Sequence, residues 1–279
     1  MVVKLEKILE TEGAVGSFNV VDLDMALAII EGAEELKVPV IIGIATRHWK
    51  AARGHLLAPS ILKAIEKASV PSVLHLDHSG PKEEHIVREA LDCGFTSIMI
   101  DGSKLPFAEN AAVTRNIVTL AKSYGASVEG EIGAITGVEG VVDGEHKSSE
   151  SLFTDPDEAE KFVIETGVNA LAVSIGTAHG LYKAEPVIQF DLISALKKKV
   201  HVPLVMHGAT GLSDEVMRKT IRCGIRKINY FSGLVVEAVE GTGRYLETAE
   251  KPDYVAMRKT LFDGWKKLAS DQMKIYSLK

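Results

Sequence analysis

The stretch KASVPSVLHLD, residues 67–77, runs from a charged helix end through Val and Pro into an apolar strand that finishes on a carboxylate. Residues 37–45 and 199–207 repeat the order of charged helix end, Val-Pro and apolar strand. Proline suits the first position of a strand because it has no N–H to donate to a neighbouring strand. The three copies therefore predict three helix-to-strand joins of one repeated kind.

Three further strands are predicted after a glycine. Glycine suits the left-handed residue just past a helix, and one stands shortly before residues 96–101, 169–175 and 226–231. Residues 14–19 and 126–131 complete a set of eight short, largely apolar strands separated by helical patterns. Strands that alternate with helices and are buried on both faces form parallel βα units.

Eight such units favour a closed (β/α)₈ TIM barrel over an open doubly wound sheet, although periodicity alone leaves the sheet open. The G-x-G-x-x-G fingerprint typical of that sheet is missing. The chain has 279 residues, 46% of them hydrophobic, and one barrel normally needs roughly 250 residues. We expect a single barrel domain over residues 1–279, ending in an amphipathic helix at 253–274.

The charge and cysteine content exclude several classes of protein. A formal net charge of -6 offers no basic stripe for nucleic acid. Neither a signal peptide nor an apolar run of membrane-spanning length is present, so we expect no membrane partner. Cys93 and Cys223 are too few for a disulfide framework. A cytoplasmic location is expected.

Polar residues fall at the ends of the predicted strands, and barrel active sites are built at the carboxyl ends of strands. Any one of them alone is more readily explained as a satisfied polar group at a barrel rim. Their coincidence on one face favours a catalytic site. In chain order they are Asn19, Thr46, Asp77, His78, Asp101, Glu129, Glu131, His179, His207 and Asn229.

Three histidines follow strands at equivalent heights and could converge on one point: His78, His179 and His207. Three neutral imidazoles with a fourth position open are a catalytic zinc arrangement. The sequence Ser-Gly-Pro after His78 is expected to end the strand and let its imidazole turn inward beside Asp77. His75 shares the inward face, and it is equally explained as a residue that supports a metal ligand or as a core histidine.

The stretch 132–153 is rich in glycine and too long for an ordinary βα connection. Loops of that length in compact domains are often lids over active sites. Glu139 lies in this stretch. It is either a residue that swings over a substrate or a solvated loop carboxylate.

Six segments in order make the sequence resemble the class II fructose-bisphosphate and tagatose-bisphosphate aldolase family over nearly the whole chain. Each segment alone is a weak signal, but together they are specific. They are SFN at 17–19, LHLDH at 74–78, MIDGS at 99–103, VEGEIG at 128–133, GTAHGLYK at 176–183 and HGATG at 207–211.

The resemblance implies a zinc enzyme that makes or cleaves a phosphorylated ketose, with dihydroxyacetone phosphate as one product. It implies that His78, His179 and His207 hold the zinc and that Glu131 can approach the metal. Removing a proton next to a carbonyl creates negative charge that a divalent cation stabilises. By similarity, Glu139 moves that proton and Asp77 handles the proton on the aldehyde oxygen.

The resemblance also implies how the substrate is held. Asn19 matches a position that touches the reacting carbons, and Arg258 matches an arginine that reaches into a neighbouring subunit to grip a distal phosphate. We therefore expect a homodimer or a homotetramer, with a monovalent cation, Na⁺ or K⁺, near the site. The residues expected to hold the phosphate of dihydroxyacetone phosphate are Gly180, Lys183, Gly208, Thr210, Asn229 and Ser232.

The chain departs from the family pattern at residues 45–49 and 229–232, which flank the substrate, so its identity stays open between tagatose- and fructose-1,6-bisphosphate-like ketoses. One alternative is a Schiff-base aldolase, for which Lys227 is the candidate because it lies within a strand. Another is a non-catalytic barrel subunit of an aldolase complex. A chelator would abolish the activity of a metal enzyme, whereas borohydride would trap substrate on a catalytic lysine.

Overall fold

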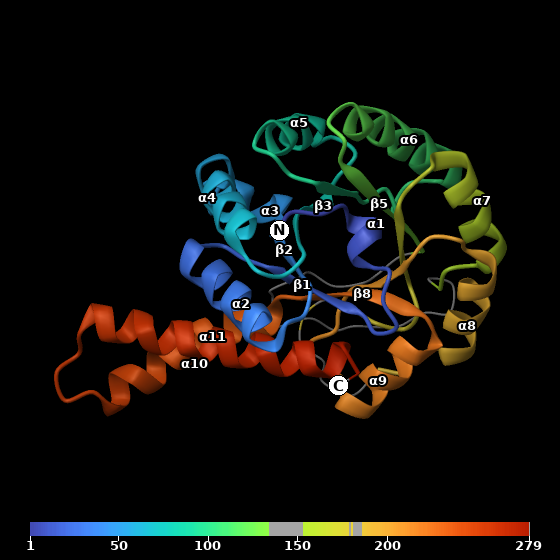
Figure 1. Ribbon diagram of the computed structural model, residues 1–279. Helices are drawn as coiled ribbons and strands as arrows, with labels where there is room; N and C mark the ends of the chain where they lie inside the picture. Colours follow the sequence, from blue (N-terminus) through green and yellow to red (C-terminus); the bar gives the residue numbers. More distant parts are fainter. Residues whose placement is uncertain (134–152, 179, 181–185, 279) are drawn as a thin grey trace.

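The computed structural model describes residues 1–133, 153–178, 180 and 186–278. Eight parallel strands close into one barrel in the order of the sequence, so the predicted (β/α)₈ fold is confirmed (Figure 1). The strands are β1 (Val15–Asn19), β2 (Val40–Ala45), β3 (Ser72–Ser79), β4 (Ser97–Ile100), β5 (Ser127–Ile132), β6 (Ala170–Val173), β7 (Leu204–Met206) and β8 (Ile225–Tyr230).

Helices ring the outside of the barrel, and the last two project to one side of it (Figure 1). The final helix packs along the first long helix of the chain. The helices are α1 (Leu5–Ile8), α2 (Leu23–Leu36), α3 (Thr46–Trp49), α4 (Gly54–Lys67), α5 (Glu84–Asp92), α6 (Phe107–Ser123), α7 (Pro156–Thr166), α8 (Phe190–Lys199), α9 (Asp214–Cys223), α10 (Ser232–Thr248) and α11 (Tyr254–Tyr276).

The helix-to-strand joins are built as the sequence predicts. β3 begins directly after Pro71, and β2 and β7 likewise begin after a proline. Gly94 and Gly167 both have the positive φ that a side chain would make costly. Asp155 caps α7, its carboxylate accepting the first free N–H groups, and Asp253 caps α11 in the same way.

The barrel interior is apolar at its amino end. Leu5 and Ile8 of α1 pack beneath the barrel against Val15, Ile41 and Val73, which point inward from the first three strands. A second and larger core lies between the outer faces of the strands and the helices. The apolar lower layer closes one end of the barrel, so a polar cavity can form only at the other.

Within the described part of the chain, no helix combines the length and the apolar character that crossing a membrane requires.

Candidate active site

Polar side chains gather at the carboxyl end of the barrel. All are buried except His78 and Asp101, which are half-buried. Because the carboxyl ends of parallel strands meet on one face, residues far apart in the sequence lie together there. They are Asn19 at the end of β1, Asp77 and His78 in β3, Asp101 just after β4, Glu131 in β5, His207 just after β7 and Asn229 in β8.

Asp77 and His78 both belong to this group although they are neighbours in one strand. Successive strand side chains point to opposite faces. At His78, however, the backbone adopts a φ of 50°, and the pairing of β3 with β4 shifts register between Leu76 and Ser79. This bulge turns the imidazole toward the cavity. The strand continues through Ser79, two residues beyond Asp77, so the backbone turn lies within the strand rather than after it.

His78 and His207 face each other across the cavity. His78 Nε2 lies 3.0 Å from His207 Nδ1, and the ring centroids are 4.6 Å apart. Nitrogens that share one tetrahedral zinc ion lie roughly 3.3 Å apart. Ligand atoms of Asp77, His78 and His207 all fall within 4.8 Å of one another. The two facing imidazole nitrogens, with the carboxylate of Asp77 beside them, therefore fit a divalent metal ion such as zinc.

The carboxylate of Glu129, inside the barrel, holds the imidazole of His207 in place. Its Nε2 lies 3.0 Å from Glu129 Oε1, which leaves Nδ1 toward His78. A carboxylate behind a histidine fixes the tautomer that presents a lone pair to a metal. Burial, together with the charge of His78, lowers the pKa of His207, which favours the neutral ring that metals bind.

Two carboxyl groups approach His78 from the other side. Ligand atoms of His78, Asp101 and Glu131 form a second group within 4.8 Å. Burial raises the pKa of Asp101, but His78 and the donors of Ser103 outweigh it and hold that pKa below its usual range. Burial and the charge of Asp101 raise the pKa of Glu131 to about 8. Without a cation, Glu131 is therefore largely protonated at neutral pH.

Asp77 is a fully buried carboxylate with two amide donors. Asn19 Nδ2 donates to Oδ2 at 2.7 Å, and Asn229 Nδ2 donates to Oδ1 at 3.0 Å. Gly43 makes room for this arrangement, because a Cβ there would overlap Asn19 Oδ1. Burial raises the pKa of Asp77, but the neighbouring charge of His78 and the hydrogen bond from His75 outweigh it and hold that pKa well below its usual range. Asp77 is ionised and can accept a proton.

The segments after β6, β7 and β8 carry the residues expected at a phosphate. Thr210 and Ser232 are buried after β7 and β8, Gly180 is buried after β6, and Gly208 is half-buried after β7. Gly208 has a φ of 73°, and a Cβ there would overlap the carbonyl oxygen of Ala178. The loop after His207 therefore lies directly against the segment that leads to residue 179. Glu139, His179 and Lys183 lie outside the described residues.

The two departures from the family pattern contact each other. The ring of His48 in α3 lies 5.2 Å from the ring of Phe231, just after β8, measured between centroids. In the same helix, Thr46 Oγ1 donates to the backbone oxygen of His78 at 2.6 Å. The two segments that differ from the family pattern thus contact each other, and one of them also contacts the backbone of His78, a candidate metal ligand.

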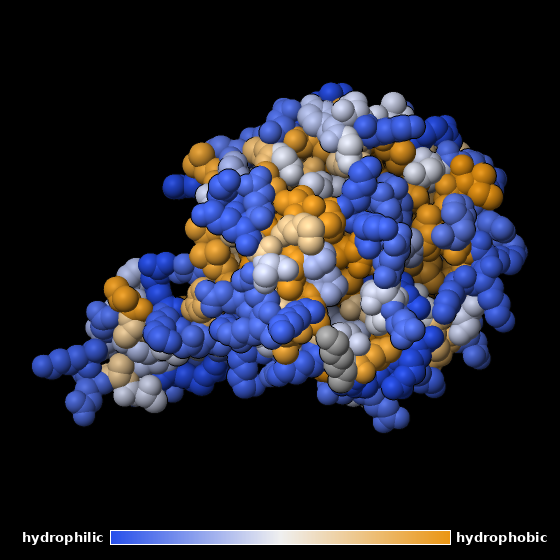
Figure 2. Space-filling view, viewed as in Figure 1, coloured by the Kyte–Doolittle hydropathy of each residue, from blue (hydrophilic) through white to orange (hydrophobic). Residues whose placement is uncertain are grey.

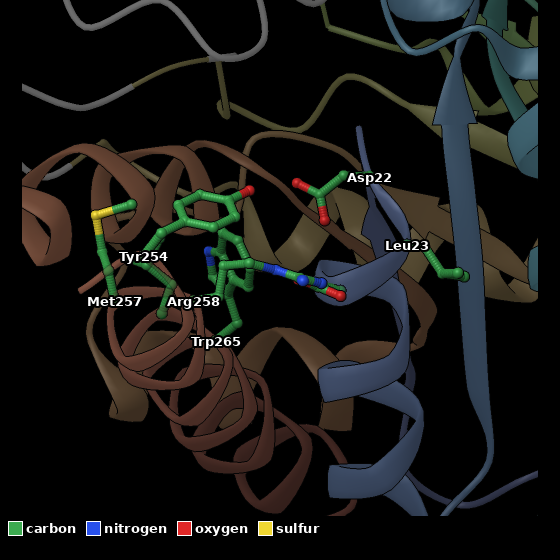
Figure 3. A pocket seen from close by; sticks show the side chains of 8 residues that line it. Asp22, Leu23, Tyr254, Met257, Arg258 and Trp265 are labelled. Atoms are coloured by element: carbon green, nitrogen blue, oxygen red, sulfur yellow. The ribbon is translucent and has the colours of Figure 1, made fainter.

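Arg258 lies on α11 and pairs within its own chain. Its guanidinium reaches toward the start of α2 (Figure 3), where Nη2 lies 2.5 Å and Nε 2.7 Å from Asp24 Oδ2. The pair borders a pocket of about 420 Å³ that Asp22 and Tyr254 also line. The side chain is half exposed, at 49%. The structure thus shows a partner for Arg258 that sequence reasoning missed.

Sequence reasoning also left three buried groups without a definite role: Glu129, His75 and Lys227. Lys227 Nζ lies 2.8 Å from Glu129 Oε2 and 3.4 Å from His75 Nε2. All three side chains are completely buried inside the barrel. The available signal was the alternation of strand side chains, which places charged residues of β3, β5 and β8 on the inward face.

Comparisons with known proteins agree with this geometry. The family model described as "Fructose-bisphosphate aldolase class-II" matches residues 2–278. A 6-phospho-5-dehydro-2-deoxy-D-gluconate aldolase from Shouchella clausii is 38% identical over 245 residues, covering 86% of this chain and 81% of that protein. The D-tagatose-1,6-bisphosphate aldolase subunit GatY from Klebsiella oxytoca is 37% identical over 242 residues, covering 86% and 82%.

Among solved structures, the YdjI aldolase from Escherichia coli superposes with a TM-score of 0.87 at 29% identity, covering 99% of this chain and 97% of that one. The match to the family model runs over almost the whole length, and each of these relatives is named as an aldolase, an enzyme that makes or breaks carbon–carbon bonds. The chain belongs to the class II fructose-bisphosphate aldolase family.

Proposed function

We propose that this protein is a zinc-dependent aldolase that reversibly cleaves a phosphorylated ketose into dihydroxyacetone phosphate and an aldehyde. The observation that carries the proposal is the ionised, fully buried Asp77 beside the facing pair His78 and His207. A carboxylate and a metal-binding pair in one cavity supply what an aldol reaction needs, which is a proton acceptor next to a Lewis acid.

The proposed zinc ligands are His78, His179 and His207, with Glu131 as a further ligand when substrate is absent. The spacing of the two described histidines supports this set. The close approach of Gly208 to Ala178 supports a third histidine at the next position in the chain. When bound, a divalent cation supplies Lewis-acid stabilisation of negative charge that develops on a carbonyl oxygen.

In this proposal the two proton transfers belong to different residues. Asp77 takes the proton from the hydroxyl of the ketose that becomes the aldehyde oxygen, and returns it in the reverse reaction. Its two amide donors, Asn19 and Asn229, hold the carboxylate in place and keep it ionised. Glu139 moves the proton on the carbon next to the carbonyl of dihydroxyacetone phosphate. Asn19 also orients the reacting carbons.

The loops after β6, β7 and β8 are proposed to hold the phosphate. Backbone N–H groups and hydroxyls there are the donors that phosphate needs, and phosphate sites after the seventh and eighth strands are common in barrels. A monovalent cation, Na⁺ or K⁺, is proposed to bind close by. The phosphate residues are Gly180, Lys183, Gly208, Thr210, Asn229 and Ser232.

The substrate is proposed to be a ketose phosphate related to tagatose- or fructose-1,6-bisphosphate. The relatives named above act, by their names, on a bisphosphate and on a phosphorylated dehydro-deoxy-gluconate, which differ in the group far from the shared phosphate. The contact between His48 and Phe231 joins the two segments that depart from the family pattern, and these segments are proposed to select that group. A panel of ketose phosphates that varies the configuration at C4 and the distal group identifies the substrate.

We further propose that the protein assembles as a homodimer or a homotetramer through α10 and α11. Figure 2 shows hydrophobic residues among hydrophilic ones on the projecting helix pair. Val239, Tyr254 and Val255 are exposed by 70%, 68% and 71%. Large exposed apolar side chains that gather on one feature are typical of an interaction surface. In the assembly, Arg258 would exchange Asp24 for an anionic group of substrate bound to the neighbouring subunit.

The two free cysteines, Cys93 and Cys223, support a reducing location such as the cytoplasm.

One experiment tests the proposed chemistry. The purified protein is assayed for ketose phosphate cleavage with and without a chelator, and again after zinc is restored. Reversible loss supports the metal mechanism, whereas activity that survives chelation, together with borohydride trapping of substrate on the protein, contradicts it.

A further inference from the structure

Lys227 donates to two buried acceptors inside the barrel. Its Nζ lies 2.8 Å from Glu129 Oε2, 2.7 Å from Asn229 Oδ1 and 3.4 Å from His75 Nε2. A lysine ammonium can only donate, so Glu129 and Asn229 are its two acceptors, while His75 Nε2, which donates to Asp77, lies beside it. The side chain is completely buried, and three strands, β3, β5 and β8, contribute these neighbouring groups.

One of these partners leads to a proposed zinc ligand. Glu129 accepts from Lys227 through Oε2, while its Oε1 lies 3.0 Å from His207 Nε2. An ionised carboxylate can only accept, so the proton of the neutral imidazole sits on Nε2. The lone pair of His207 is then on Nδ1, the atom that faces His78 Nε2 at 3.0 Å.

A second partner leads to Asp77. An ammonium only donates, so the amide of Asn229 must turn its oxygen toward Lys227. The amide nitrogen then faces Asp77 Oδ1, to which it donates at 3.0 Å. The flipped amide would set its NH₂ against the ammonium and its oxygen against the carboxylate, which is repulsive at both ends. The charge on Lys227 therefore decides which way Asn229 points.

We propose that Lys227 is a positioning residue that fixes which atoms donate and which accept in two chains of hydrogen bonds. Through Glu129 it orients His207 for zinc, and through Asn229 it orients the amide that donates to Asp77. The inference rests on the proposed metal site. It assigns Lys227 a different role from that of a Schiff-base nucleophile, because an ammonium paired with a carboxylate has no lone pair with which to attack a carbonyl.

The test compares Lys227→Met, Glu129→Leu and the double variant, using the whole protein. The zinc dissociation constant is measured by competition with a chromophoric chelator, and the melting temperature is measured on the metal-free protein. Losing an outer partner of a metal ligand typically weakens metal binding by about 10–100-fold, and we expect this loss in Glu129→Leu. Lys227→Met, which acts one contact further out, should weaken zinc binding by about tenfold, the low end of that range. Lys227→Gln keeps one donor toward Glu129 but loses the positive charge, so it is also expected to raise the zinc dissociation constant. It replaces the Met variant in the test if that variant does not fold.

The double variant separates positioning from simple stabilisation. Replacing a buried ion pair by apolar residues is often neutral or stabilising, so its melting temperature should recover toward the wild-type value. Its zinc affinity should stay as low as that of Glu129→Leu, because Lys227 acts on the metal ligand only through Glu129. Ketose phosphate cleavage by the zinc-saturated double variant should still be slow, since Asn229 has lost the donor that orients it.

Ser97→Ala is the matched control. Ser97 Oγ lies 2.8 Å from His75 Nδ1 in the same buried layer. Among the described contacts it pairs with neither Glu129 nor Asn229. Its zinc dissociation constant should stay within about twofold of wild type. A folded Lys227 variant that also stays within about twofold overturns the inference, as does an equal loss in Ser97→Ala. Failure of the wild-type protein to bind zinc would instead overturn the proposed function.

Discussion

Replacing Asp77 by alanine should separate carbon–carbon cleavage from the other steps of the reaction. The substitution removes the proton acceptor proposed for the aldehyde oxygen but leaves His78 and His207 in place. We therefore expect the variant to bind zinc and to retain proton exchange on dihydroxyacetone phosphate. Ketose phosphate cleavage should be the step that is lost.

The size of the effect follows from the surroundings of Asp77. General acid–base catalysis by a positioned group contributes about 10²–10⁴-fold, or about 3–5 kcal/mol of transition-state stabilisation. The variant also leaves the buried amides of Asn19 and Asn229 without their acceptor. Each unsatisfied buried donor costs about 1–3 kcal/mol, so the free energy of unfolding should fall by about 2–6 kcal/mol. Water that enters the cavity would reduce this cost.

The assay follows two rates on the same folded sample, checked by circular dichroism. Cleavage is measured by release of dihydroxyacetone phosphate, and exchange by loss of the carbon-bound proton in heavy water. Glu139→Ala is the matched control, and it should slow the exchange more than Asp77→Ala does. If both variants lose exchange equally, the division of labour between the two carboxylates is wrong.

Three further predictions follow from the described contacts. His207→Ala should lose most of its bound zinc, because it removes one of the three proposed histidine ligands, and the buried Glu129 loses its partner, so the free energy of unfolding should fall as well. Full zinc content of the folded variant by atomic absorption would contradict the assignment. The raised pKa of Glu131 means that the metal-free folded state keeps a proton that the unfolded state releases above its ordinary pKa of 4.5, so the contribution of Glu131 to stability should fall as pH rises from about 5 to 8. Glu131→Gln should remove this contribution from the pH dependence of the melting temperature of the metal-free protein. An unchanged pH dependence in the variant would contradict the raised pKa of Glu131. Asp77→Ala mixed with Arg258→Ala should regain cleavage under subunit exchange, because one hybrid site is intact; confirmed exchange without added activity refutes action across the interface.

The fold was predictable because its signals are local. A proline before a strand and a glycine after a helix act within a few residues, and the structure has both where the sequence predicts them, as at Pro71 and Gly94. The strand count then selects the barrel, and the barrel brings the strand ends together. For the same reason, the sequence alone predicts that Asn19, Asp77 and His207 are neighbours, as the structure shows.

The parts of the site that were not predictable depend on partners far apart in the chain. The positive φ of His78 is unusual for a residue with a side chain, and no local motif demands it. The sequence shows Lys227 and Glu129 as inward-facing charges but not that they pair with each other. The pairing of Arg258 with Asp24 likewise joins the two ends of the chain, and only the packing of α11 on α2 creates it.

The most direct test of the central claim is the metal content of the purified protein, measured together with its cleavage of ketose phosphates. The account predicts about one zinc ion per chain, loss of cleavage when a chelator removes the zinc, and recovery when zinc is returned. Full cleavage by metal-free protein, with substrate trapped on Lys227 by borohydride, would contradict it.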